Sequence, residues 1–240
     1  MEIVLWGVRG NIATPSPAMS FYGGNTACVE LHTDNGLRLI FDAGTGLRLC
    51  GENLPESGTC HLFLSHAHAD HIQGLGFFLP LHSPRWTTHI YIPTGLEGLL
   101  DCQFANGMFP MPGSSFAGKV VRHRLQAGDV VRFNEEATVS ALAATHPGGA
   151  LAYKVRADKA TFLYTGDYEI APDPEAQLAA REMLGNVDLA IVDSMGARIL
   201  RRIHTRLSTS LGSSRSSLRV PVRLMSMAGK TRFSERWRSR

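Results

Sequence analysis

Residues 62–74 have the sequence LFLSHAHADHIQG, and this stretch decides the expected fold and chemistry. Four residues of metal-ligand type follow its short apolar strand: His66, His68, Asp70 and His71. Alternate residues of an extended chain point the same way, so His66 and His68 can bind one metal ion. A turn two residues later lets Asp70 and His71 face a second ion. A single histidine on a loop is usually solvated, but this spacing after an apolar strand favours ligands.

Mixed nitrogen and oxygen ligation indicates two divalent ions, with Zn²⁺ expected first and Mn²⁺ or Fe²⁺ as alternatives. Two neighbouring ions acidify a water molecule and neutralise charge that develops on a substrate oxygen. The stretch therefore predicts a metal-dependent hydrolase that uses a metal-bound hydroxide, with Asp70 both as ligand and as catalytic residue.

The order of these residues strongly resembles the metallo-β-lactamase superfamily, whose α+β fold is a four-layer αββα sandwich with a dinuclear metal site at one edge. Later motifs extend the resemblance: THPGG contains His146 after an expected strand, and FLYTGDYE contains Asp167 after another. The resemblance implies that His146 joins His66 and His68 on one metal ion. It also implies that the carboxylate of Asp167 bridges the two ions.

Three upstream motifs resemble the branch that contains RNase Z-like enzymes and cyclic phosphodiesterases: GVRGN (7–11), YGGNTACVEL (22–31) and LIFDAGTGLR (39–48). This resemblance implies a phosphodiester substrate, such as a cyclic nucleotide or an RNA end. It also implies that Asp42 supports the metal ligands without being one of them. A diiron redox protein of similar fold is disfavoured, because such proteins carry an acidic residue where His68 stands.

Short apolar segments separated by Gly, Pro, Asn and Asp predict many strands and few helices. The expected strands are Ile3–Trp6, Cys28–Thr33, Leu37–Phe41, His61–Ser65, His89–Pro93, Val130–Phe133, Thr138–Ala144, Leu151–Val155, Thr161–Tyr164 and Leu189–Asp193. The expected helices are Leu96–Gln103 and Pro174–Leu184. Strands and helices do not strictly alternate, which favours two packed sheets with helices outside them.

The charge is divided unevenly along the 240 residues. Residues 1–193 carry 12 basic and 20 acidic side chains. Residues 194–240 carry 12 basic side chains, 11 of them Arg, and one acidic side chain, and they also contain 10 Ser. We expect a hydrolase domain over 1–193 and an atypical segment over 194–240. A shifted reading frame is the leading explanation, with a disordered basic tail or an RNA-binding arm as alternatives.

The family pattern continues with another helix, a strand and a last metal-binding histidine, and no such segment is evident after residue 193. His204 is the only later histidine, and it lies in an Arg-rich run. A missing ligand weakens metal binding, so an impaired or inactive relative is the alternative to an active enzyme.

Cys28, Cys50, Cys60 and Cys102 are widely spaced and predict buried, reduced thiols. The start MEIVLWGVRG lacks the features of a secretory signal, and no apolar run reaches 18 residues. We therefore expect a cytoplasmic protein without membrane contact, acting on a small-molecule or nucleotide substrate. The sequence indicates no oligomeric state.

Overall fold

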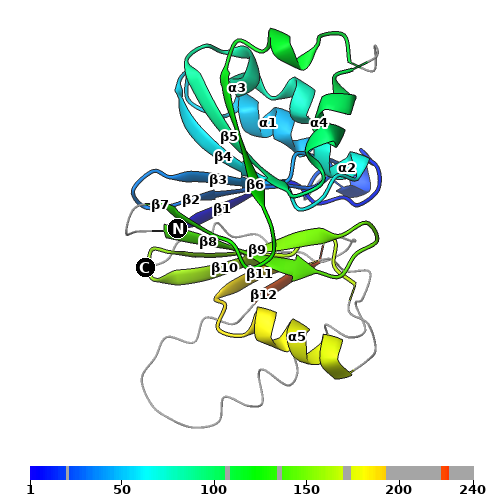
Figure 1. Cartoon of the computed structure of the whole chain (residues 1–240), viewed down its shortest axis with the longest axis vertical. Coiled ribbons are helices and arrows are strands. Elements are labelled where there is room, and N and C mark those ends of the chain that lie inside the picture. The colour runs from blue at the N-terminus through cyan, green and yellow to red at the C-terminus, as the bar shows by residue number, and fades with distance from the viewer. Residues whose placement is uncertain (20–21, 106–108, 134–136, 170–173, 193–222, 227–240) are drawn as a thin grey trace. The chain divides into compact units, whose positions relative to one another are not determined.

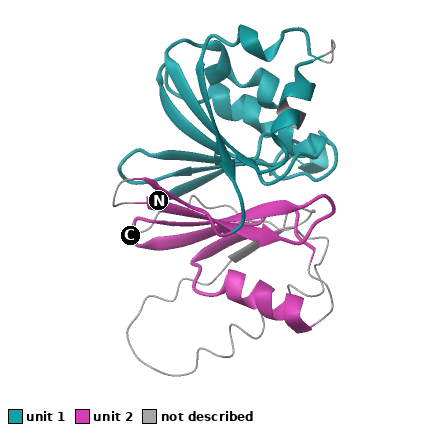
Figure 2. Cartoon of the chain, in the orientation of Figure 1, with its two compact units in different colours: residues 1–127, 230–240 teal, residues 128–229 magenta. Residues whose placement is uncertain are grey.

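The computed structural model of the chain describes residues 1–19, 22–105, 109–133, 137–169, 174–192 and 223–226. The chain forms two compact units (Figure 2). The described residues of the first unit fall within 1–127, and those of the second within 128–229.

The first unit contains a six-stranded sheet in the order β1-β2-β3-β4-β5-β6 (Figure 1). Its strands are β1 (Glu2–Gly7), β2 (Cys28–His32), β3 (Arg38–Phe41), β4 (Gly58–Phe63), β5 (Trp86–Pro93) and β6 (Lys119–Leu125). Its helices are α1 (Gly46–Glu52), α2 (Ala69–Ile72), α3 (Leu79–His82) and α4 (Glu97–Gln103). The pairs β1–β2 and β2–β3 are antiparallel, whereas β3 to β6 run parallel. Parallel neighbours require crossover connections, and the helices lie in those connections.

The core of the first unit lies between its sheet and its helices. Alternate residues of β4 and β5, such as Leu62 and Ile90, pack in one buried cluster with Leu47 of α1 and Leu81 of α3. Because successive strand residues point to opposite faces, the residues between them lie on the other face of the sheet. The helix-covered face of this sheet is therefore apolar, as the alternating pattern of β4 and β5 requires.

The described residues of the second unit form a six-stranded sheet in the order β12-β11-β10-β9-β8-β7 and the helix α5 (Figure 1). Its elements are β7 (Val130–Phe133), β8 (Ala137–Ala144), β9 (Ala150–Ala157), β10 (Ala160–Tyr164), α5 (Pro174–Leu184), β11 (Leu189–Val192) and β12 (Arg223–Ser226). Helix α5 buries Ala180, Met183 and Leu184 in one apolar cluster with residues of β9, β10 and β11. Strand β9 is antiparallel to both β8 and β10, so β8 and β10 end at the same edge of the sheet.

All ten predicted strands and both predicted helices are present, and the α+β class is confirmed. The sequence pattern did not predict α1, α2, α3, β6 or β12. Strand β6 has the sequence KVVRHRL, in which the positions facing α4 include arginines that pair with acids, so it lacks an apolar alternation. Strand β12 lies in the segment where no strand was expected, and it pairs in parallel with β11. That expectation was wrong because a four-residue strand gives almost no periodic signal.

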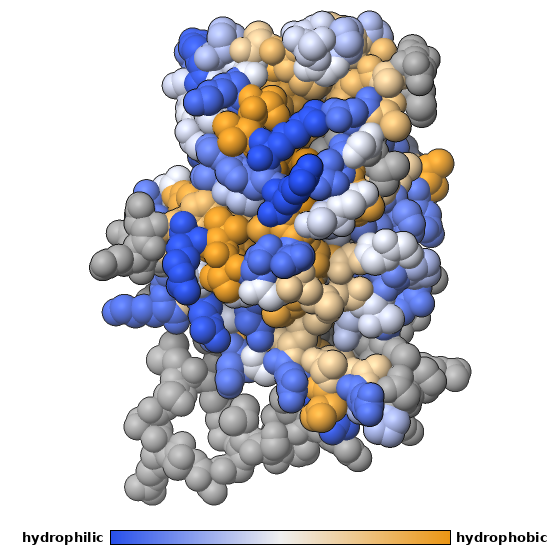
Figure 3. Space-filling model, viewed as in Figure 1, coloured by the Kyte–Doolittle hydropathy of each residue, from blue (hydrophilic) through white to orange (hydrophobic). Residues whose placement is uncertain are grey.

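The four cysteines are free thiols, and three of them are buried as expected. Cys102 is exposed, so the prediction of a buried thiol was wrong there. Among the described residues, no helix is both long and apolar enough to cross a membrane. Figure 3 shows separate hydrophobic areas among hydrophilic ones on the viewed face of both units.

Three histidines lie on adjacent strands on the face of the first sheet opposite α1 and α3. The rings of His61 and His89 are stacked with centroids 4.8 Å apart, and those of His89 and His123 are 5.1 Å apart. His89 Nδ1 and His123 Nε2 share a hydrogen bond of 2.8 Å, and His61 Nδ1 lies 3.2 Å from the Tyr91 hydroxyl. Burial, followed by the charges that His89 and His123 acquire when protonated, lowers the pKa of His61 to about 4.

This histidine row predicts a loss of stability in mild acid. The unfolded chain takes up a proton at His61 near pH 6.5, whereas the folded chain does so only near pH 4, so the free energy of unfolding falls as the pH drops through that window. In His61→Gln we expect the acid-induced fall in the free energy of unfolding to be smaller by about 1 kcal/mol, a modest value because the ring is partly exposed. The acid-induced fall in melting temperature should accordingly be smaller by about 2–4 °C. Melting curves at pH 7.5 and pH 4.5 test this, and equal acid sensitivity in both proteins would contradict it.

Candidate metal centre

The first group of predicted ligands lies between β4 and the end of α2. After β4 the chain passes through Leu64 and Ser65 to His66, whose side chain is buried. His68 is exposed and precedes α2 in extended conformation, with φ −63° and ψ 148°. The first turn of α2 then contains Asp70 and His71, both buried. The predicted order of strand, extended ligand segment and turn is therefore present in the structure.

Asp42, at the end of β3, is the polar centre of this group. Its side chain is fully buried, and its backbone has φ +60°, a conformation that side chains rarely adopt. Oδ1 accepts the Ser65 N–H at 2.7 Å, and Oδ2 accepts the Ser65 hydroxyl at 2.7 Å and His71 Nδ1–H at 2.6 Å. Strain in the backbone at one residue is sustained where the surroundings fix it, and here three hydrogen bonds do so.

These hydrogen bonds determine which nitrogen of each histidine can bind a metal. His71 donates from Nδ1 to a carboxylate, so its lone pair is on Nε2. The Ser65 hydroxyl gives its proton to Asp42, so it accepts from His66 Nδ1 at 2.9 Å, and the lone pair of His66 is also on Nε2. A single carboxylate therefore sets the tautomers of His66 and His71, whose ring centroids are 4.3 Å apart.

The surroundings also keep Asp42 ionised. Burial alone raises the pKa of Asp42, but the positive charge that His71 and His66 carry when protonated and the hydrogen bonds from His71 and the Ser65 amide together outweigh burial. The net result is a pKa below the ordinary aspartate value. An ionised carboxylate accepts hydrogen bonds only, which is what the two histidine tautomers require.

Asp70 is held from the N-terminal part of the chain. Its Oδ2 atom accepts the backbone N–H of Asn11 at 2.7 Å and lies 3.6 Å from His71 Nε2. That separation fits two ligands of one tetrahedral ion, whose bonds are about 2.0–2.2 Å long. Asn11 belongs to the GVRGN motif and has φ +65°. The motif therefore positions a carboxylate through its backbone.

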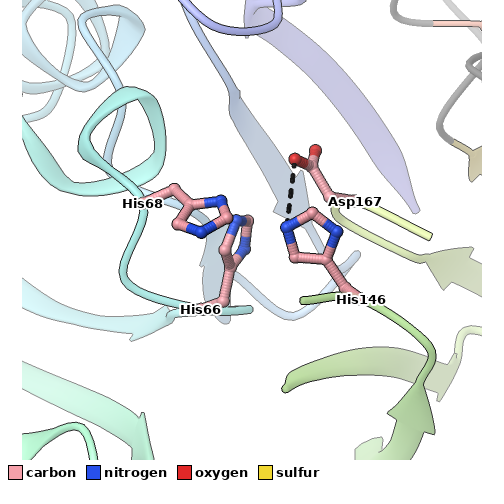
Figure 4. A group of neighbouring side chains, drawn as sticks. All are labelled: His66, His68, His146 and Asp167. Atoms are coloured by element: carbon pink, nitrogen blue, oxygen red, sulfur yellow. Dashed lines mark ion pairs between the residues drawn. The ribbon is translucent and has the colours of Figure 1, made fainter. Parts of the chain in front are cut away.

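His146 and Asp167 lie in the second unit. His146 follows β8 and Asp167 follows β10, at the edge of the sheet where both strands end. His146 Nε2 is 3.7 Å from Asp167 Oδ2, the ion pair marked by the dashed line in Figure 4. On the other side of the ring, His146 Nδ1 lies 3.7 Å from Glu169 Oε1, and the Glu169 N–H binds the Thr145 carbonyl at 2.8 Å. The sheet thus brings an imidazole and a carboxylate together.

The first unit therefore holds four of the predicted site residues in one place, and the second unit holds two. Figure 4 shows four of them, His66, His68, His146 and Asp167, which offer three imidazole nitrogens and one carboxylate. Imidazole nitrogens and carboxylate oxygens are the donor types that divalent metal ions take in proteins. His204 lies outside the described residues.

Three further residues, Ser65, Asn11 and Glu169, support the ligands and were not identified from the sequence. Ser65 precedes the first histidine directly, and a hydroxyl at that position was the only signal for it. Asn11 acts through its backbone, which leaves no side-chain signature. Glu169 follows Asp167 by two residues, but acids are common in loops, so the spacing alone was uninformative.

Mixed sheets with few helices, and histidine and carboxylate side chains at the ends of their strands, are the features of a metallo-β-lactamase fold. Residues 37–226 match the family model described as the beta-lactamase superfamily domain, and the chain belongs to that superfamily. The match continues past residue 193 and includes β12. No curated protein matched the chain.

Solved structures of the same fold are similar to the chain at low sequence identity. The metallo-beta-lactamase fold protein YhfI from Bacillus subtilis has a TM-score of 0.59 and 18% identity, covering 80% of this chain and 70% of that one. The short form of human tRNase Z has a TM-score of 0.60 and 18% identity, covering 85% and 88%. A diphosphatase from the PhnP family has a TM-score of 0.59 and 16% identity, covering 93% and 94%. These similarities confirm the sandwich fold that the sequence predicted.

Proposed function

We propose that the chain is a metal-dependent phosphodiesterase that cleaves a cyclic nucleotide or an RNA end. The observation that carries this proposal is the Asp42 network, which presents Nε2 of both His66 and His71 as ligand atoms. Two of the similar structures, tRNase Z and the PhnP-family diphosphatase, bear names that refer to phosphate-ester or phosphoanhydride chemistry. Both comparisons favour phosphorus as the reacting centre over a β-lactam carbonyl.

The proposed ligand sets follow the sequence prediction. His66, His68 and His146 would hold one ion, Asp70 and His71 would hold a second, and the Asp167 carboxylate would be shared between them. Zinc is the proposed metal because imidazole nitrogens dominate the donor set, and Mn²⁺ and Fe²⁺ remain alternatives. Divalent ions at these positions would acidify water and neutralise charge on the phosphoryl oxygens.

The residues of the chain contribute orientation and proton control. Asp42 keeps the protons of His66 and His71 on Nδ1, so neither imidazole can turn its N–H toward the reacting centre. Asp70 uses Oδ2 to accept the Asn11 amide, which fixes the plane of its carboxylate. We propose that this fixed carboxylate orients the attacking water and accepts its proton.

Hydrolysis of bis(p-nitrophenyl) phosphate by the metal-free chain reconstituted with Zn²⁺ or Mn²⁺ tests the proposal. His68→Ala is a suitable inactive comparison, because the exposed His68 can be removed without opening the core. We expect turnover by the native chain, loss of at least about 100-fold in the variant, and close to two bound ions per chain by elemental analysis. Bound metal without turnover on any phosphodiester would contradict the proposed substrate, and a folded chain that binds no metal would contradict the proposed site.

A further inference from the structure

A row of aromatic rings runs through the first unit from its core to its surface. Phe116 and Phe104 pack against the buried apolar cluster. The ring of Phe104 meets Phe116 at 87° and Phe109 at 86°, and Phe109 meets Phe77 at 76°, with centroids 5.1–5.4 Å apart. Edge-to-face contacts of this kind are favourable beyond their buried area, so they hold each ring in a defined orientation.

Phe77 is the outer end of this row, and its side chain is 56% exposed. Phe109 lies so close beneath it that a Cβ atom on Gly76 would be 2.3 Å from the Phe109 ring. Only glycine permits that approach, so the segment around Phe77 is seated directly on the aromatic row. A large apolar ring is therefore packed against Phe109 while more than half of its surface is open to solvent.

The exposed ring is on the same short segment as two proposed metal ligands. Phe77 lies in the 3₁₀ turn Leu75–Phe77, seven residues after Asp70 and six after His71. The Gln103 side chain, at the end of α4, also donates to the Ile72 carbonyl at 3.0 Å. The aromatic row is thus connected to helix α2 in two ways, along the chain through residues 73–76 and by this hydrogen bond from α4.

The segment that contains Phe77 carries no charged side chain. Residues 73–81 have the sequence QGLGFFLPL, without an acidic or basic side chain, whereas the ligand segment before it is rich in ionisable groups. A substrate that spans both would carry its charge at one end and a neutral, flat group at the other. A nucleotide has this form, since a phosphate and a base are separated by one sugar.

We propose that the exposed ring of Phe77 is a stacking platform for the nucleobase of the substrate. The inference rests on the proposed phosphodiesterase function and narrows it to esters that carry a nucleoside. Stacking of a base on an aromatic side chain contributes enough free energy to change binding by about 10-fold or more, and it does so with little preference among bases. The platform therefore selects nucleotides over simple phosphodiesters without selecting one base.

Two esters with the same leaving group test the platform: p-nitrophenyl thymidine 5′-phosphate and methyl p-nitrophenyl phosphate. Both release p-nitrophenolate, and only the first carries a base. We expect Phe77→Ala to lower kcat/KM for the thymidine ester by about 10-fold and to leave the methyl ester within a factor of about 2. Phe77→Trp should restore the preference, and Leu79→Ala, which removes a neighbouring side chain that is 51% exposed, should not alter it. An equal loss for both esters, or no loss for either, would overturn the proposal.

A binding measurement separates this inference from the proposed function. In Phe77→Trp, stacking of a base quenches the fluorescence that the variant gains over the native chain. We expect quenching by adenosine 5′-monophosphate and none by ribose 5-phosphate. If the native chain cleaves neither ester, the phosphodiesterase proposal fails, and base-specific quenching would still support the platform. Absence of quenching by the nucleotide would overturn the platform whether or not the chain is active.

Discussion

Replacing Asp42 with asparagine is expected to weaken metal binding by about 10–100-fold and to lower phosphodiester hydrolysis at least as much. The substitution preserves the size of the side chain, and asparagine is among the residues that best tolerate the φ of +60° found at this position. The effect therefore comes from hydrogen bonding and charge, and we expect the backbone at residue 42 to keep its conformation.

The reason is the proton that Asp42 controls. An asparagine oxygen can replace one carboxylate oxygen toward the Ser65 amide, but the amide NH₂ then faces Nδ1–H of His71. Two donors repel, so His71 must shift its proton to Nε2 and lose the lone pair that binds the metal. The same replacement removes the acceptor for the Ser65 hydroxyl, which orients His66. One substitution thus disturbs a ligand of each proposed ion.

Zinc titration with a competing chelator measures the affinity, and circular dichroism confirms that the variant is folded. Asp158→Asn is the matched control, because Asp158 also has a positive φ, of 50°, and lies in the turn between β9 and β10, at the opposite end of β10 from Asp167. The control should bind metal like the native chain. Unchanged zinc affinity in Asp42→Asn would show that the carboxylate does not set the tautomers.

The grouping of the proposed ligands in the first unit could be predicted because they are local in sequence. The spacing of His66, His68, Asp70 and His71 after an apolar strand is enough to place them at one sheet edge, and the structure has them there. The supporting role of Asp42 came from resemblance to a family, and the hydrogen bonds of the structure supply its physical basis. His146 and Asp167 required the same resemblance, since neither has a local pattern that distinguishes it from a loop residue.

Other features depend on contacts between distant residues and have no local signal. The bond between the Asn11 amide and Asp70 joins residues 59 positions apart and uses no side chain of the motif. Strand β6 is stabilised by pairing with β5 and by the ion pairs of Arg122 with Asp101 and Arg124 with Glu97. Its basic sequence lacks the apolar alternation of a typical strand, so the strand could not be predicted from the pattern. The aromatic row is similar, because Phe77 and Phe109 are brought together by tertiary structure alone.

Gly74→Ala is expected to destabilise the fold by about 3 kcal/mol or more, because two backbone segments meet at this glycine. A Cβ atom there would lie 2.0 Å from the Gly44 carbonyl oxygen and 2.9 Å from that of Ala43. The Gly74 N–H also binds the Ala43 carbonyl at 2.8 Å, which holds the two segments together. The native φ of −80° suits any residue, so steric overlap alone causes the loss.

Gly98→Ala is the matched control for this substitution. A Cβ atom on Gly98, in α4, would meet nothing within 4 Å, so this variant should gain about 0.5–1 kcal/mol from its lower entropy in the unfolded state. Differential scanning calorimetry should place the melting temperature of Gly74→Ala about 6–12 °C below that of the native chain.

The overlap at Gly74 also has a consequence for the metal ligands. The turn that must move away, residues 42–44, contains Asp42, so the strain is transmitted to the carboxylate that orients His66 and His71. No side-chain rotamer can relieve a clash between a Cβ atom and a backbone carbonyl, so whatever folded protein remains should also bind zinc more weakly than Gly98→Ala. Native stability together with native zinc affinity in Gly74→Ala would show that these two segments do not pack as closely as the structure has them.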